Sequence, residues 1–240
     1  MASAPTAASI LAELGKLGSA SYKKVVMTHG VREPVHGVKI SDLKVIQKRA
    51  GGTNHALAQE LWDSGVYDAM YLAGLLADDA QMRKRDLQHW IDGAYCQMLA
   101  EYSVAWVTAG SPDGWQVAMK WIGSKKEREA AAGWNALAGI VAMTDDDDLD
   151  LDALRELLQR IPRTIGAAAN RAKYAMNGFV AAIGIYCRPL AAQALAVGKA
   201  LGTVEVDMHG TSCKVPKVPE MIAKAKARGA IGKKRRMVKC

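Results

Sequence analysis

Apolar residues recur along most of the chain at intervals of three and four positions, the spacing that places side chains on one face of an α-helix. Leu43 and Ile46 show this spacing, and so do Leu72, Leu75 and Leu76. Glycine and proline interrupt the pattern often, so it predicts short helices joined by short loops. The expected helices cover residues 7–16, 19–29, 42–49, 55–63, 68–76, 87–107, 112–123, 125–142, 151–159, 164–185, 189–202 and 219–227.

Three of these expectations rest on single features. Residues 87–107 are predicted to form one long amphipathic helix, with a break at Gly93 left open as the alternative. Pro162 is predicted to end one helix before the next begins at Thr164, because proline lacks an N–H and clashes with the preceding turn. Residues 203–208 alternate valine with polar residues and are expected to be extended, without belonging to a sheet.

The composition supports a fold of helices packed on helices. Phenylalanine occurs once and aromatic residues make up 6% of the chain, whereas alanine and leucine are abundant. Such a chain is predicted to be all-α and to pack as antiparallel helix pairs, either as an α-solenoid with degenerate repeats or as a compact bundle. Residues 1–213 are expected to form the helical domain, and residues 214–240 a separate basic segment.

Positive charge is concentrated in that C-terminal segment. It contains ten Lys and Arg side chains and one carboxylate, Glu220, so it carries a net charge of +9. The whole chain carries +8, and residues 1–213 therefore carry −1. A segment of this kind is typical of polyanion binding, although a merely solubilising terminus has the same composition. The cations assigned to contact with such a polyanion are Lys214, Lys217, Lys233, Lys234, Arg235 and Arg236.

The sequence predicts neither a membrane span nor a metal or cofactor site. No apolar run approaches the roughly 20 residues that cross a bilayer, and residues 1–9 lack the features of a secretion signal. Four scattered cysteines without a Cys-x-x-Cys pair favour reduced thiols in the cytoplasm. Asp207, His209 and Cys213 lie close together, but their spacing is not that of a zinc site. We therefore expect a cytoplasmic monomer without a metal, cofactor or membrane contact.

Residues 170–179 place polar side chains on a helix that is otherwise rich in Ala, Ile and Val. Asn170, Tyr174 and Asn177 are spaced by four and three positions and share one face, with Arg171 and Lys173 beside them. Such a stripe either lines a binding groove or makes buried polar ties to neighbouring segments. The sequence leaves both alternatives open.

Aromatic residues and one carboxylate are the candidates for chemistry. Five of the six tryptophans lie between residues 90 and 134. Most are expected in the core, but a subset lining a groove can stack against bases or sugars. Gln97 and Glu101 are four apart and share a helix face. Glu101 either stabilises positive charge that develops on a sugar or is an ordinary surface or capping residue.

Several stretches together point to one family. They are His29–Lys39 followed by Asp42 and Leu43, Leu61–Gly74, Trp90, Glu101–Tyr102 with Trp106, Trp121–Ile122, Arg171–Phe179, Cys213–Pro216 and Gly232–Arg236. Over nearly the whole chain, and most specifically in its first third, they resemble the HEAT-like DNA alkylation repair family. The resemblance implies an α-solenoid of degenerate HEAT-like helix pairs, an armadillo-type superhelix whose concave basic face cradles duplex DNA. Active members cleave the N-glycosidic bond of cationic alkylpurines without flipping the base into a pocket.

The resemblance also locates where this chain departs from the active glycosylases. Those enzymes use a Trp and an Asp one helical turn apart, an Arg on a later helix, and a further Trp. Aligned through Trp121, the four positions are occupied by Gly93, Gln97, Ala131 and, at or near the last, Phe179. The carboxylate that would stabilise an oxocarbenium-like sugar is therefore absent from its place.

The resulting hypothesis is a DNA-binding protein of the alkylation repair family whose partner is double-stranded DNA. If it is an active DNA N-glycosylase, Glu101 is the candidate catalytic carboxylate, and Tyr95, Trp134 and Phe179 are the candidate groove aromatics. The alternative is a non-enzymatic α-solenoid scaffold for protein, RNA or unusual DNA structures. The DNA contacts expected on the helix are Arg171, Lys173, Tyr174 and Asn177.

Overall fold

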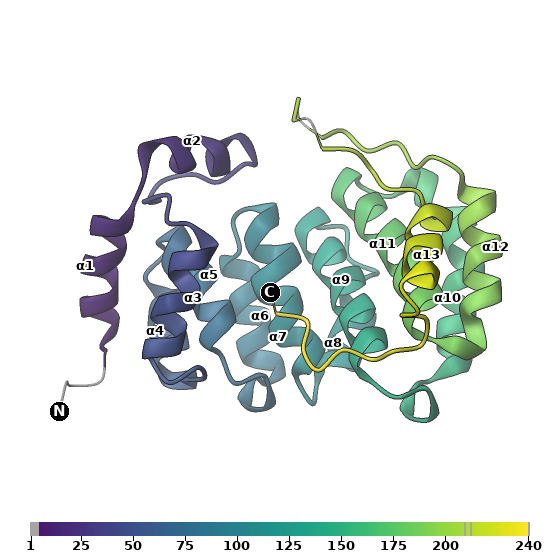
Figure 1. Cartoon of the computed structure of the whole chain (residues 1–240), viewed down its shortest axis with the longest axis horizontal. Helices are drawn as coiled ribbons and strands as arrows, with labels where there is room; N and C mark the ends of the chain where they lie inside the picture. The colour runs from purple at the N-terminus through teal and green to yellow at the C-terminus, as the bar shows by residue number, and fades with distance from the viewer. Residues whose placement is uncertain (1–4, 209, 212, 240) are drawn as a thin grey trace. The chain divides into compact units, whose positions relative to one another are not determined.

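The structure is a computed structural model that describes residues 5–208, 210–211 and 213–239. The chain forms two compact units (Figure 1). Unit 1 consists of Met1–Asp113 with Lys239–Cys240, and unit 2 consists of Gly114–Val238. Every regular element in the described residues is a helix, so the all-α prediction is confirmed. The boundary predicted after residue 213 stays a prediction.

Unit 1 is built around one fully buried helix. All ten residues of α5 are buried, and α3 and α4 pack on it. The side chain of Asn54 caps α4 by accepting a hydrogen bond from the Leu57 N–H, which confirms the predicted start of that helix. The elements of unit 1 are α1 (Ala7–Leu17), α2 (Ala20–Thr28), α3 (Ile40–Arg49), α4 (His55–Asp63), α5 (Tyr67–Leu76), η1 (Asp79–Gln81), α6 (Lys84–Gly93), η2 (Leu99–Val104) and α7 (Ala105–Gly110).

Unit 2 is centred on two long helices that pack against each other. Helix α9 contacts α8 and α11, and α11 in turn contacts α12 and α13 (Figure 1). The elements are α8 (Gly114–Trp121), α9 (Glu127–Met143), η3 (Asp146–Asp148), α10 (Leu151–Thr164), η4 (Ile165–Ala167), α11 (Asn170–Tyr186), η5 (Arg188–Leu190), α12 (Ala191–Leu201) and α13 (Val218–Ala227). Residues 203–208 are extended without pairing in a sheet, as the alternating pattern predicts.

Helix α13 is fastened to unit 2 by close packing on two glycines. A β-carbon at Gly198 would lie 2.4 Å from Val218 Cγ1, and one at Gly184 would lie 2.3 Å from Ile222 Cδ1. Only a residue without a side chain allows α13 to approach α11 and α12 this closely. Part of the basic C-terminal segment is therefore packed structure.

Residues 87–107 do not form one long helix, and the alternative break at Gly93 is present. Helix α6 ends at Gly93, residues 94–96 are not helical, and the chain then passes through the π-helical turn η2 into α7. Glycine is a poor helix former, and Ala94 adopts an extended conformation directly after it. The apolar spacing continues across the break, so it favours one long helix, and Gly93 is the feature of the sequence that marks the break.

The predicted helix break at Pro162 is also wrong. Helix α10 continues through Pro162 and ends two residues later. The missing N–H falls in the last turn, where side chains supply additional donors. Arg163 Nε donates to the Gln159 carbonyl at 3.2 Å, and Thr164 Oγ1 donates to the Arg160 carbonyl at 3.1 Å.

No single described helix is both long and apolar enough to cross a membrane. Helices α11 and α12 would satisfy length and composition only as a pair, and the chain bends by 111° between them.

Candidate nucleic-acid interface

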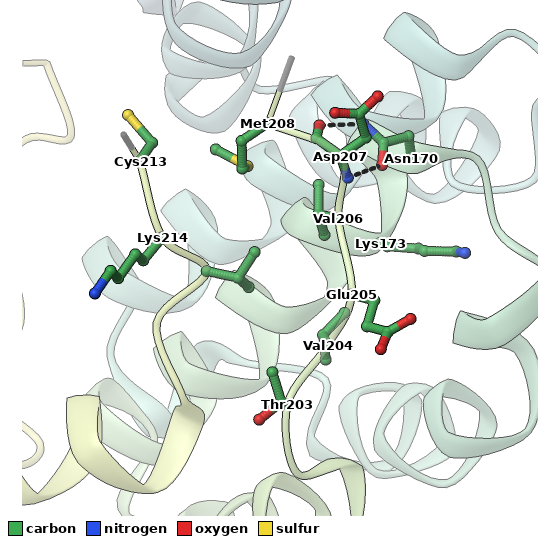
Figure 2. Close-up of a pocket in the computed structure, with 11 residues that line it drawn as sticks. Asn170, Lys173, Thr203, Val204, Glu205, Val206, Asp207, Met208, Cys213 and Lys214 are labelled. Carbon is green, nitrogen blue, oxygen red and sulfur yellow. Dashed lines mark hydrogen bonds between the residues drawn. The ribbon is translucent and has the colours of Figure 1, made fainter. Parts of the chain in front are cut away.

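The first half of α11 holds an extended segment in place. Asn170 Nδ2 donates to the Asp207 carbonyl at 2.8 Å, and the Asp207 N–H donates back to Asn170 Oδ1 at 2.7 Å (Figure 2). One side chain therefore satisfies both main-chain groups of Asp207. Segment 203–208 is therefore fixed near its C-terminal end, because Asn170 replaces the donor and the acceptor that a neighbouring strand would offer to Asp207.

A second asparagine on the same face holds the returning segment. Asn177 is buried, and its Nδ2 donates to the Pro216 carbonyl at 2.8 Å. Of the two alternatives for the polar stripe, Asn177 makes a buried tie to a neighbouring segment, whereas the hydrogen bonds of Asn170 lie at the exposed surface. Those segments, 203–208 and 213–217, then shape the surface beside α11.

Between these segments and α11 lies a cavity of about 720 Å³, which we call the loop cavity. Lys173 and Lys214 line it, as do Glu205 and Asp207, so its cations and carboxylates balance. Figure 2 shows the two lysine side chains pointing in opposite directions. The structure thus brings two predicted DNA contacts to one site, together with acidic groups that the prediction did not include.

Arg171 and Tyr174 form a cation–π pair. The guanidinium carbon lies 4.5 Å from the ring centroid, and Arg171 Nη1 contacts Met208 Sδ at 3.9 Å. The Arg171 N–H donates to Glu127 Oε1 at 2.8 Å, which links α11 to the start of α9. Both side chains are half-buried, so each retains an exposed surface for a ligand.

The predicted tail cations fall into two groups. Lys234 is largely buried: its Nζ lies 2.8 Å from Asp146 Oδ1 and donates to the Val141 carbonyl at 3.1 Å. The Arg235 N–H donates to the Ala142 carbonyl, which fixes the main chain there. The side chains of Lys214, Lys217, Lys233, Arg235 and Arg236 are exposed.

Within unit 1, Lys239 occupies a buried position. Its side chain is 12% exposed, and its Nζ lies 2.6 Å from Asp79 Oδ1 and 2.7 Å from the Ala77 carbonyl. Burial raises the pKa of the Asp79 carboxyl above its ordinary value, while the charge of Lys239 acts in the opposite direction. This cation belongs to the folded core of the unit.

The candidate catalytic carboxylate lies inside unit 1. Glu101 is in the π-helical turn η2 and is 7% exposed. Single π turns inside helices are frequent at functional sites. This π turn runs directly into α7, whose residues 105–109 are buried. Tyr95 Oη donates to the Arg32 carbonyl at 3.2 Å, and the Arg32 guanidinium lies over its ring. Burial raises the pKa of Tyr95.

The structure shows the surroundings of Gly93, Gln97 and Ala131, the positions that the resemblance predicts to match the glycosylase residues. A β-carbon at Gly93 would lie 3.1 Å from Trp62 Nε1, so the indole of Trp62 occupies this space. Trp62 itself stacks on Trp90 with ring centroids 4.2 Å apart. Gln97 is half-buried, and Ala131 is fully buried at 0% exposure.

Trp134 and Phe179, two of the predicted groove aromatics, are core residues of unit 2. Their ring centroids lie 5.1 Å apart, and the side chains are 2% and 0% exposed. Trp134 also forms part of the wall of a cavity beside α10 and α11. Three cations at that cavity are not among the residues predicted from the sequence: Lys125, Arg160 and Arg163.

The described residues hold no group of three or more His, Cys, Asp or Glu side chains that could bind a metal ion. Of the three neighbours Asp207, His209 and Cys213 that the sequence brings together, His209 lies outside the described residues.

Comparison with known proteins identifies the family. The family model described as "DNA alkylation repair enzyme" matches residues 10–214. The chain belongs to the DNA alkylation repair enzyme family. The family predicted from the sequence is thereby confirmed, and the match includes residues of both units.

Two proteins from Listeria have sequences similar to this chain. The uncharacterized protein Lin0241 of Listeria innocua is 31% identical over 221 residues, covering 90% of this chain and 95% of the relative. The uncharacterized protein Lmo0209 of Listeria monocytogenes is 30% identical with the same coverage. The similarity thus extends over nearly the full length of the chains.

A solved structure extends the comparison. It is described as "a new family of proteins related to the HEAT-like repeat DNA glycosylases with affinity for branched DNA structures". It is 35% identical to this chain, with a TM-score of 0.89, and the match covers 98% of this chain and 100% of the other. The HEAT-like fold class predicted from the sequence is confirmed by this likeness.

Proposed function

We propose that this protein binds double-stranded DNA, that it prefers branched DNA, and that unit 2 provides the contact around the first half of α11. The observation that carries the proposal is that Asn170 and Asn177 hold segments 203–208 and 213–217 against α11. This arrangement places Lys173 of α11 and Lys214 of the second segment at one cavity. Its support is the affinity for branched DNA stated for the structural relative. Lys214 is exposed and Lys173 is half-buried, and lysines that reach solvent beside such a surface are suited to phosphate contacts.

The test is a pair of binding titrations at one salt concentration. A fluorescently labelled four-way junction and a linear duplex of the same sequence are each titrated with the full chain. We expect the junction to bind at least about tenfold more tightly, a difference of roughly 1.4 kcal/mol. Equal affinities would contradict the proposed preference for branched DNA. Absence of binding to both DNAs would contradict the proposed DNA binding itself.

The double variant Lys173→Ala/Lys214→Ala locates the contact. Because each lysine that binds a phosphate releases counterions, removing two should weaken binding to both DNAs and reduce the salt dependence. Lys199→Ala, an exposed lysine on α12 outside the loop cavity, is the matched control. Unchanged affinity of the double variant with intact helical circular dichroism would contradict a contact at this surface.

We further propose that excision of alkylpurines is weak or undetectable. An alkylpurine leaves as a good leaving group, so catalysis depends on stabilising the cationic sugar. Gln97 cannot carry a negative charge, and Glu101 is the candidate that can. If base release from N3- or N7-alkylated duplex occurs, Glu101→Gln should abolish it and Gln97→Asp should raise it. Robust release that survives Glu101→Gln would assign the chemistry to another group.

A further inference from the structure

Unit 2 contains a second cavity, of about 540 Å³, which we call the α10–α11 cavity. Its lining comes from the loop between α8 and α9, from α9, from the last turn of α10, and from the residues that lead into α11. A volume of this size lies within the about 300–1,000 Å³ that is usual for small-ligand sites.

The cavity has an apolar floor. Ile122, Trp134 and Met176 contribute buried side chains, and alanines of α9 and α11 complete the surface. Such a floor favours a flat apolar group over a fully hydrated ion, because water gains little from contact with it.

The rim of the same cavity is cationic. Lys125, Arg160 and Arg163 line it, and no carboxylate does. Within the described residues, none of these three side chains forms an ion pair, although Arg163 donates from Nε to a main-chain carbonyl. Glu156 of α10 does not line this cavity, but it lines an adjoining cavity together with Arg160 and Arg163. Three unneutralised cations beside an apolar floor fit a ligand with one flat apolar part and one anionic part.

The cavity borders the proposed DNA contact. Ala172 and Met176, which line the α10–α11 cavity, are one helical turn apart on α11. Asn170 and Lys173, which line the loop cavity, lie on the adjacent side of the same turns. A DNA strand that contacts Lys173 is therefore close enough to present a neighbouring nucleotide to the second cavity.

We propose that the α10–α11 cavity binds one unpaired nucleotide of a branched DNA, with the base on the apolar floor and its phosphate at Arg160 and Arg163. This inference rests on the proposed DNA binding and specifies its substrate. Branched DNA differs from a linear duplex in offering unpaired or frayed nucleotides where its arms meet. A site for one such nucleotide gives a physical basis for the preference, since a base is captured most easily where it is already unpaired.

The test compares a fully paired four-way junction with the same junction carrying one unpaired nucleotide at the branch point. Wild-type protein should bind the second DNA about tenfold more tightly, the scale expected for burying one base. The variant Arg160→Ala/Arg163→Ala should lose this gain while keeping the affinity for the paired junction. Replacing the unpaired nucleotide by an abasic one should remove most of the gain from the wild type.

Arg155→Ala is the matched control, because Arg155 is on the same helix, pairs with Asp152 and lies outside the cavity. It should retain the full gain, and both variants should keep the wild-type melting temperature. No gain in the wild type, or a gain that persists in Arg160→Ala/Arg163→Ala, would overturn the inference while leaving DNA binding intact. Calorimetric binding of free deoxynucleoside monophosphate without any gain on DNA would assign the cavity to a free nucleotide and also overturn it.

Discussion

The C-terminal segment and the rim of the α10–α11 cavity both carry basic side chains, but the two regions differ in what surrounds those charges. In the segment, Lys234 pairs with Asp146 and Lys239 pairs with Asp79. At the cavity rim, Arg160 and Arg163 have no carboxylate partner in the described part of the chain. The segment's formal charge of +9 therefore overstates what it can offer to a phosphate, since a charge already paired gains less from a new anion.

The strongest test of this difference removes a cation that is held inside a unit. Lys239→Ala leaves the Asp79 carboxylate largely buried without its partner, and we expect unfolding to become easier by about 1–3 kcal/mol, less than for a fully buried pair because the site is partly exposed. Lys233→Ala, an exposed neighbour in the same segment, should change the unfolding free energy by less than about 0.5 kcal/mol. Denaturant unfolding of both variants measures the two effects.

The same variant has a pH signature. A carboxyl group whose pKa is raised by folding contributes stability that falls as the pH rises through the interval between its ordinary and raised values. Without Lys239, the pKa of Asp79 rises further, so the destabilisation should be greatest at neutral pH. The destabilisation should shrink below about pH 4, where Asp79 is protonated in both the folded and the unfolded state. A loss of stability that does not depend on pH would contradict the burial of this charge.

The next test concerns the cations that the segment leaves exposed. Lys233→Ala/Arg235→Ala/Arg236→Ala should weaken junction binding and reduce the slope of log affinity against log salt by up to about 3, close to one for each phosphate that the variant no longer binds. Point substitutions are preferable to deleting residues 230–240, because the main chain of Gly232 and Arg235 bonds to Ile185 and Ala142. An unchanged slope would exclude these three side chains from DNA contact.

The smallest effect is expected for the paired lysine. Lys234→Ala should leave the salt slope of junction binding unchanged, because its charge is already held by Asp146. It should lower the unfolding free energy by only about 1 kcal/mol, since the carboxylate keeps the Arg188 N–H as a donor. A salt slope reduced as much as in the triple variant would mean that paired and exposed cations contribute equally to DNA binding. That result would contradict the distinction between the two kinds of cation.

The sequence is informative where local chemistry determines local structure. The Asn54 cap and the apolar spacing after it correctly predict α4, and residues 203–208 are extended as expected. The prediction fails at Pro162 because α10 continues through it to Thr164, with the Arg163 and Thr164 side chains donating to carbonyls of this last turn. That error also conceals the cavity, because it separates Arg160 and Arg163, which share one turn of α10.

Contacts between distant residues explain the remaining differences. Asp146 and Lys234 are 88 residues apart, and no local pattern reveals that one neutralises the other. The two roles considered for the Asn170–Asn177 stripe are equally compatible with its spacing, and only the positions of Asp207 and Pro216 decide between them. Trp134 and Phe179 carry no local sign that their rings are buried against each other.

The central claim is that this member of the alkylation repair family binds branched DNA without excising the damaged base. One measurement addresses both parts: a four-way junction carrying a single N7-alkylguanine is incubated with excess protein, and retention of the junction and release of the base are followed in the same samples. The account predicts a retained junction and base release no faster than in a protein-free control. Release well above that control, or failure to retain the junction, would contradict it.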